Sequence, residues 1–268
     1  MNVKRIGFFV VLVLIMAGGG VFAHERGDLM LNIEPIVGLS IPNIDIKVGN
    51  ETIEDFFAPI IGSDIDSTVA GAYLALFGTV HYYFWDFFGV NAGLGINTYI
   101  NSYTLKILES TDYKDDLTFS FSSVYIGIPI GVRLSYSAFA TGAGFVINIP
   151  IGSSAKMSYY VESQYGTGMV SKTDEDKRFT LDTHLGWYFD IGFDLSGIKE
   201  RNGGFGMLVR LGGSLSDKIG GTTSTIKIGD AGYTFIERRM DYDPFRHFAV
   251  SLVFQFASKL ASLPIVTN

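Results

Sequence analysis

The sequence predicts an all-β protein, an eight-stranded antiparallel up-and-down β-barrel that crosses a bacterial outer membrane. Three features predict this fold class. The N-terminus has the pattern of an export signal, eight segments alternate apolar with small or polar residues, and long and short connections alternate between these segments. We expect the long connections outside the cell and the short turns in the periplasm.

The first 23 residues have the pattern of a cleaved signal peptide. Lys4 and Arg5 precede an apolar run from Ile6 to Met16, and Val21-Phe22-Ala23 places compact residues where a signal peptidase cuts. The apolar run is too short for a membrane anchor, which needs about 20 residues. We therefore expect a cleaved signal peptide over 1–23, a barrel over 24–256 and a C-terminal periplasmic tail over 257–268.

Composition agrees with an exported barrel. The 268 residues include no cysteine, which excludes a lipid-modified thiol and any disulfide. Removal of Lys4 and Arg5 changes the formal net charge from −7 to −7 − 2 = −9, so we expect no nucleic-acid partner. Glycine is abundant, and no apolar run after residue 23 is long enough for a membrane helix.

The first four segments alternate clearly. In the fourth, every even position from Val124 to Leu134 is Val, Ile or Leu, whereas the odd positions include Gly127, Gly131 and Arg133. Such a period of two is typical of a strand with one apolar face. The four segments cover residues 29–41, 70–82, 88–97 and 123–134.

Four further segments repeat the pattern in the second half, over residues 139–149, 179–193, 207–215 and 248–256. Each segment has about the 9–11 residues that cross a bilayer at a tilt of about 45°. The connections near Trp85-Asp86, at 135–138 and at 196–204 are short. The other connections are long, at 43–67, 102–118, 153–178 and 217–244.

The period does not decide which face points outward. A soluble lipocalin-like barrel or a sandwich would turn the apolar face inward. We favour the membrane barrel, because the Phe, Trp, Ile and Leu side chains of this face are bulky for an eight-stranded interior. Aromatic residues between Tyr82 and Phe88 are expected to form an interfacial girdle.

Three prolines fit the pattern less well, because proline removes a donor from the hydrogen-bond ladder. Pro35 lies inside the first segment. Pro129 lies in the middle of the fourth segment, where we expect a bulge or a shift in register. Pro150 is expected at the outer end of the fifth segment.

The export signal, the eight segments and the rhythm of connections resemble small outer-membrane barrels of the OmpA, OmpX and OmpW type. The stretch FGTVHYYFWDFFGVNAGLGIN (77–97) looks like their aromatic hairpin followed by a Gly-rich strand. The resemblance implies a last strand with alternating aromatics for the barrel-assembly machinery, matched here by Phe254 and Phe256. Ser251, where such signals often have glycine, and the residues after Phe256 depart from that pattern.

Charged and polar residues on the other face are expected to line the lumen. Near the periplasmic ends of their strands lie Glu34, His81, Arg133, Asp190 and Arg210. Asp182, His184 and Asp194 share the same face. Buried charges need partners, so we expect Asp190 to pair with Arg210 and Glu34 to meet Arg133 across the lumen. Such a layer is either a structural plug or a gate.

No catalytic or cofactor-binding motif stands out, and we expect no enzyme, cofactor or metal site. Asp182 and His184 share a face and could orient Ser123 or Ser251, but these residue types are common in barrels. The four histidines show no metal-ligand spacing.

Two functions remain open. The first is a narrow passive channel or uptake route for small solutes, apolar ones included. The alternative is a non-conducting structural or adhesion barrel with a host or surface partner. Both have outer-membrane lipids and the assembly machinery as partners. The acidic first loop (43–67) also contains Phe56, Phe57 and Ile60, and we expect an amphipathic segment there, beginning near Asn50, to cover the barrel mouth.

Overall fold

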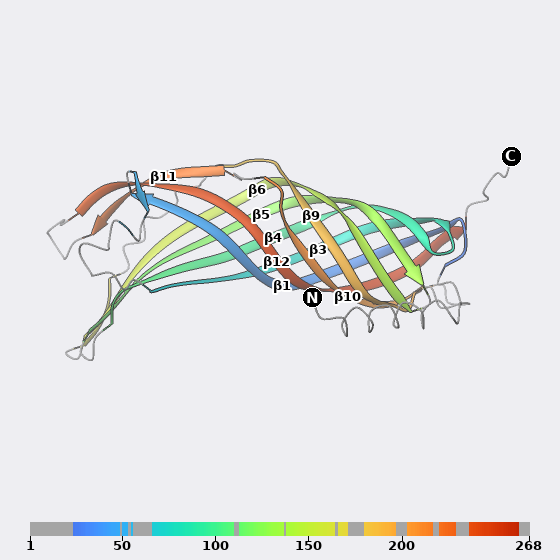
Figure 1. Ribbon diagram of the computed structural model, residues 1–268, viewed down its shortest axis with the longest axis horizontal. Coiled ribbons are helices and arrows are strands. Elements are labelled where there is room, and N and C mark those ends of the chain that lie inside the picture. The colour runs from blue at the N-terminus through green and yellow to red at the C-terminus, as the bar shows by residue number, and fades with distance from the viewer. Residues whose placement is uncertain are drawn as a thin grey trace, which may run out of the picture.

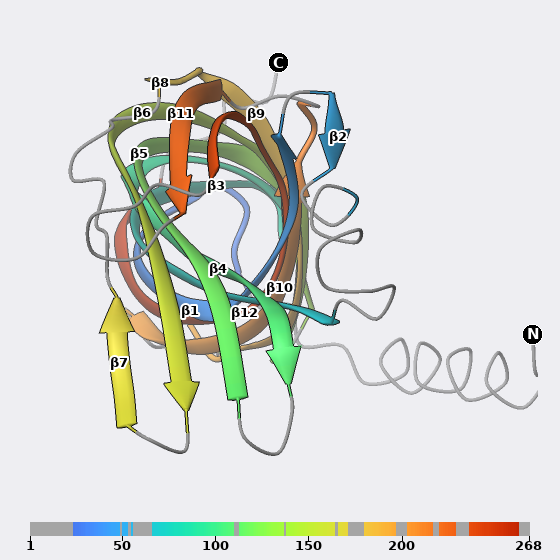
Figure 2. The ribbon, with the colours of Figure 1, turned by 90° about the vertical axis from the view of Figure 1, so that its left-hand side faces the viewer.

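Eight antiparallel strands form a closed ring in the computed structural model of the chain (Figures 1 and 2). The strands are β1 (Asp28–Val48), β3 (Asp66–Trp85), β4 (Phe88–Glu109), β5 (Tyr113–Tyr136), β6 (Phe139–Ser163), β9 (His184–Asp194), β10 (Gly203–Ser214) and β12 (Ile236–Ser262). Each strand pairs with the next along the ring, and β12 pairs with β1 to close it. The predicted fold class is confirmed.

The structure describes residues 24–48, 50–52, 55, 66–109, 113–136, 138–163, 166–170, 180–196, 203–216, 220–228 and 236–262. The predicted signal peptide (1–23) and most of the segment expected to cover the mouth (53–65) lie outside these residues. Four short strands extend the sheet at one end: β2 (Glu51–Thr52), β7 (Gly166–Val170), β8 (Thr180–Leu181) and β11 (Gly220–Ile228). None of the described residues forms a helix long and apolar enough to cross a membrane.

The strands are longer than the alternation of apolar residues indicated. Residues 102–118 were expected to form a loop, but β4 continues to Glu109 and β5 begins at Tyr113, and the two strands pair as far as Glu109 with one shift in register between Lys106 and Leu108. β6 likewise continues to Ser163. At the other end, β12 continues past Phe256 to Ser262, where Ser262 pairs with Asp28. The loops were overestimated because the strands continue where their outward residues stop being apolar.

The prolines are accommodated in different ways. The register of β4 with β5 is the same on both sides of Pro129, so the expected bulge at Pro129 is wrong. The bulge lies instead on β6: Val124 and Tyr125 of β5 pair with Gly152 and Pro150, so Ile151 is the extra residue. Pro150 therefore does not end its strand. Pro150 lies next to the extra residue of the bulge, and the sheet tolerates a proline at this position because the ladder is interrupted at a bulge.

The apolar face points out of the barrel, as predicted. Leu39, Leu94 and Phe193 are each at least 60% exposed, whereas the residues beside them on the other face are largely buried. Exposed aromatic side chains gather near the short turns, at Phe84, Trp85, Phe87, Phe193, Phe205 and Phe256. This apolar wall with an aromatic border at one end is the surface of a transmembrane barrel. The soluble alternative, with the apolar face inside, does not form.

The same strands change character away from the short turns. On β5 the outward residues are Val, Ile and Leu from Val124 to Leu134, but they are Thr118, Ser120 and Ser122 farther out. On the inward face of this outer half, Leu117, Phe119 and Phe121 are buried. We call residues 101–109 of β4 and 113–122 of β5, together with the adjoining outer parts of β3 and β6, the extension. It projects beyond the ring in Figure 2.

Candidate functional site

A layer of charged side chains fills the lumen near the short turns, which is the periplasmic end of such barrels. Glu34 comes from β1, Arg133 from β5, Asp190 and Asp194 from β9, and Arg210 from β10; all five are buried. His81 of β3 belongs to the same layer and is 1% exposed. We call these six residues and Gln255 of β12 the charge layer. Their inward direction follows from the parity of each strand.

Arg210 is the centre of the charge layer. Its Nε donates to Oδ1 of Asp190 and its Nη2 donates to Oδ2, both at 2.7 Å, so the two side chains form a bidentate pair. The same guanidinium lies 3.5 Å from Glu34 and 4.5 Å above the centre of the Tyr188 ring. Asp190 and Arg210 also face each other in the β9–β10 register. The expected partners therefore lie together.

Arg133 and Glu34 do not pair in the way the sequence suggested. Arg133 donates to Asp194 and to Gln255, both at 2.7 Å. Glu34 instead accepts from the Thr79 hydroxyl at 2.9 Å and lies 3.5 Å from His81. The ring order explains this correction: Glu34 is two strands from Arg210 through β12, but three strands from Arg133 through β3 and β4. Arg210 is simply the nearer cation.

Above the charge layer, aromatic and amide side chains fill the lumen. The rings of Tyr73 and Tyr99 are 4.7 Å apart, and that of Tyr125 follows at 6.1 Å from Tyr99. His184 contacts both Tyr125, at 5.0 Å between ring centres, and the Asn148 amide, at 3.1 Å. Asn148 also accepts from Asn97 at 3.0 Å. These side chains come from five strands and cross the lumen.

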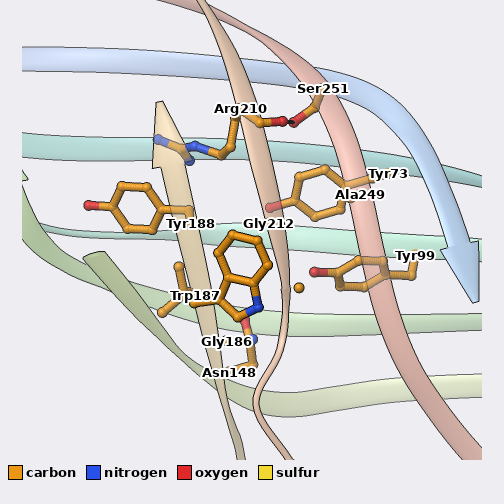
Figure 3. A pocket seen from close by; sticks show the side chains of 12 residues that line it. Tyr73, Tyr99, Asn148, Gly186, Trp187, Tyr188, Arg210, Gly212, Ala249 and Ser251 are labelled. Carbon is orange, nitrogen blue, oxygen red and sulfur yellow. Dashed lines mark hydrogen bonds between the residues drawn. The ribbon is translucent and has the colours of Figure 1, made fainter. Parts of the chain in front are cut away.

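One small cavity lies between the two layers (Figure 3). Its volume is about 30 Å³, and Tyr73, Tyr99, Tyr188 and Arg210 are among its lining residues. In Figure 3 the Tyr73 and Tyr99 hydroxyls point into the space beside β10. A cavity of this size holds about one water molecule. It is no conduit for a solute.

Sequence reasoning missed the tyrosines. Tyr73, Tyr99, Tyr125 and Tyr188 share strand parity with the polar residues, so alternation alone could have placed them inside. They were not among the expected lumen residues, because only charged residues and histidines of that face were selected. Asp182 was placed in the lumen wrongly: it lies between β8 and β9 and is exposed. Its alternation with His184 does not continue a strand.

Nothing in the described part of the chain assembles a hydrolytic triad around His184. Its Nδ1 lies 3.4 Å from the backbone oxygen of Asp182, and the Asp182 carboxylate is at the surface. Within the same described residues, no group of three or more His, Asp or Glu side chains is arranged to hold a metal ion.

The residues before β1 close the periplasmic side of the charge layer. Gly27 has a positive φ of 90° and donates from its backbone nitrogen to Tyr83. This turn places the buried ring of His24 on Tyr83, with 3.8 Å between ring centres. Burial lowers the pKa of His24 to about 4. Asp28 secures the turn by accepting from Lys259 at 2.7 Å and from Ser262 at 3.0 Å.

Solved structures with a similar course of the chain are bacterial outer-membrane proteins. The outer membrane protein OprG from Pseudomonas aeruginosa is 14% identical, with 87% of this chain and 97% of that chain covered and a TM-score of 0.39. Ail, the attachment invasion locus protein of Yersinia pestis, solved with the heparin analogue sucrose octasulfate, is 10% identical, with coverages of 85% and 99% and a TM-score of 0.31. The outer membrane protease OmpT from Escherichia coli is 8% identical, with coverages of 87% and 97% and a TM-score of 0.33.

No protein-family model matches the chain, and no curated protein matches its sequence. The similarity to solved structures concerns the fold alone. The similar structures include one protease, OmpT, and several proteins that are not described as proteases. The closed ring of eight strands and its apolar outer wall leave only a bilayer as the surrounding medium. The chain forms a transmembrane β-barrel, and the solved structures to which it is similar in fold are bacterial outer-membrane proteins.

Proposed function

We propose that this protein is a non-conducting barrel that acts at the cell surface through its extension. The observation that carries the proposal is the filled lumen. Both guanidinium groups of the charge layer are engaged by carboxylates at 2.7 Å, and the cavity beside Arg210 has a volume of only about 30 Å³. Such an interior, in the part of the chain that the structure describes, favours a closed barrel over an open channel.

The extension supports a role outside the membrane. β4 and β5 continue to Glu109 and from Tyr113, well beyond the last outward aliphatic residues Ile100 and Val124. Passive anchoring in a bilayer needs only about 9–11 residues per strand. The additional length builds a folded surface with an apolar interior, which is the kind of scaffold that presents loops to a partner.

A narrow gated channel is the second candidate function. It is favoured by polar side-chain atoms that have no protein partner at successive heights of the lumen, at Asn32, Asn97 and Asn101. Water molecules would satisfy these atoms and hydrate a path for a small solute. In this case the Arg210 pairs are the gate, and the resting protein is closed.

Conductance of refolded protein in planar bilayers separates the two. The surface-barrel proposal predicts no unitary conductance from the wild type or from Arg210→Ala, although the variant loses stability. Reproducible channels in the wild type contradict this proposal. If Arg210→Ala forms channels and the matched variant Ser251→Ala on the neighbouring strand does not, the gated-channel function replaces the surface-barrel proposal.

Three further assignments are part of this proposal. Residues 1–23 are removed on export, Phe254 and Phe256 engage the assembly machinery, and outer-membrane lipids surround residues 28–41 and their counterparts on the other strands. Phe256 points outward and is 52% exposed, next to Phe205 at 5.5 Å between ring centres, which leaves it accessible during insertion. The sequence of the mature N-terminus, read from purified protein, tests the cleavage after Ala23.

A further inference from the structure

A groove runs across the outer wall of the barrel in its periplasmic half. The strand registers align Val80, Ala92, Ile130, Phe145 and Trp187 in one outward row across β3, β4, β5, β6 and β9. The next row toward the periplasm contains Tyr82, Val90, Val132, Ala143 and Phe189. Each row thus has one alanine among large side chains.

The two alanines create the groove. Ala92 of β4 and Ala143 of β6 end at Cβ on either side of Ile130 and Val132 of β5, and the side chains of Tyr82, Phe145 and Trp187 complete the lining. The resulting hollow has a volume of about 930 Å³ and an almost wholly apolar lining. This volume is at the upper end of the range of about 300–1,000 Å³ for small-molecule sites. A hollow of this volume has room for part of a flexible hydrocarbon chain.

The wall behind the groove is closed. Gly131 and Gly144 carry no side chain there, and a Cβ at either position would overlap the Tyr188 hydroxyl inside the lumen. Tyr188 in turn donates to Asn91 at 3.1 Å, which holds the ring against these glycines. The groove is consequently a surface site with a firm floor, separate from the charge layer.

We propose that this groove binds one acyl chain of a phospholipid from the periplasmic leaflet. The groove is continuous with the lipid-facing wall, and Tyr82, Val90 and Ala143 lie within a few residues of the periplasmic turns. Hydrocarbon of that leaflet is thus the medium at this depth, and the periplasmic leaflet of an outer membrane consists of phospholipid. An acyl chain in the groove would contact the aromatic and aliphatic side chains that line it, among them Tyr82, Ile130 and Phe145.

A second copy of the chain fits the groove poorly. A two-fold interface brings the same patch of both subunits together, and two concave surfaces would enclose a void. The convex aromatic rims, Trp187 and Phe145, would meet first and hold the floors apart. A single lipid chain has the complementary shape.

Electron spin resonance of spin-labelled phosphatidylethanolamine in proteoliposomes tests the site. The wild type should show a larger motionally restricted component than the groove-filling variant described next. In the groove-filling double variant Ala92→Phe, Ala143→Phe this additional component should fall at least two-fold. Both substitutions face lipid, so heat-modifiable gel migration and circular dichroism should remain those of the wild type.

The matched control is Ala72→Phe, an outward alanine of β3 that lies outside the groove and should leave the restricted component unchanged. An equal restricted component in the groove-filling variant overturns the proposal. So does an equal loss in Ala72→Phe. Native mass spectrometry adds a second criterion. If the protein retains lipopolysaccharide in preference to phosphatidylethanolamine, the groove has another occupant and the proposal is contradicted. The same holds if the wild type is a dimer that the groove-filling variant abolishes. If the filling variant fails to fold, Ala92→Leu alone must still lower the component.

Discussion

The membrane-spanning part and the extension are built from the same strands with opposite polarity. On β5 the spanning part directs Val124, Ile126 and Ile128 outward and Arg133 inward. The extension directs Ser120 outward and Phe119 inward. The backbone pairing continues through the change, with one bulge next to Val124.

This difference shows that the surroundings, and not the strand, set the side-chain pattern. In the bilayer the outer face meets hydrocarbon and the narrow interior takes the polar groups, which must then satisfy one another. Beyond the bilayer the outer face meets water, and the interior becomes an ordinary apolar core. The interiors are therefore held together by different forces, ion pairs in one part and apolar packing in the other.

The largest loss of stability is expected when the ion pairs inside the spanning part are broken. Arg210→Ala leaves Asp190 and Glu34 buried without their shared cation, which should lower the free energy of unfolding by about 3–5 kcal/mol. Urea unfolding in detergent or lipid measures it. The double variant Asp190→Ala, Arg210→Ala should lose less than the sum of the two single variants. Simple additivity would show that the pair is not coupled.

The next largest effect locates the boundary of the bilayer between the spanning part and the extension. Ile128→Arg places a cation in hydrocarbon and should cost about 2–4 kcal/mol, whereas Ser120→Arg on the same face of β5 should cost close to zero. Both variants are compared by unfolding in phospholipid vesicles. Equal costs would mean that the bilayer also surrounds the extension, and a neutral Ile128→Arg would mean that this face does not meet lipid.

The smallest effect concerns the periplasmic end, where His24 seals the charge layer. Because its pKa is lowered to about 4 in the folded protein, the unfolded chain takes up the proton first as the pH falls. The contribution of neutral His24 is fully present above about pH 6.5 and is lost progressively toward pH 4, by up to about 3 kcal/mol. Unfolding curves across this range measure it.

His24→Phe keeps a ring on Tyr83 and removes the titration, so this variant provides the control for the pH dependence. Its stability should change less than that of the wild type between pH 6.5 and pH 4. The same acid-induced loss in both proteins would assign the pH dependence to other groups.

Much of the spanning part could be predicted from the sequence, because a period of two with a bulky apolar face is a local signal. Val124 to Leu134 is an example, and so is the inward parity of Arg133 and Arg210. The extension could not be predicted in the same way. Its outward Thr118 and Ser120 resemble loop residues, and its inward Leu117 and Phe119 follow the opposite face from the apolar residues of the spanning part.

The sequence by itself determined the eight spanning segments, the face that meets lipid and the set of charges that must share the lumen, since each follows from residues close together in the chain. The Asp190–Arg210 pair also followed from two neighbouring segments, but only the tertiary structure decided the partners of Glu34 and Arg133. Glu34 and Arg133 have suitable charge and depth, but the closed ring places Arg210 nearer to Glu34 and gives Arg133 to Asp194 and Gln255. Such partners depend on strand order and side-chain reach across the lumen, and no local period contains that information.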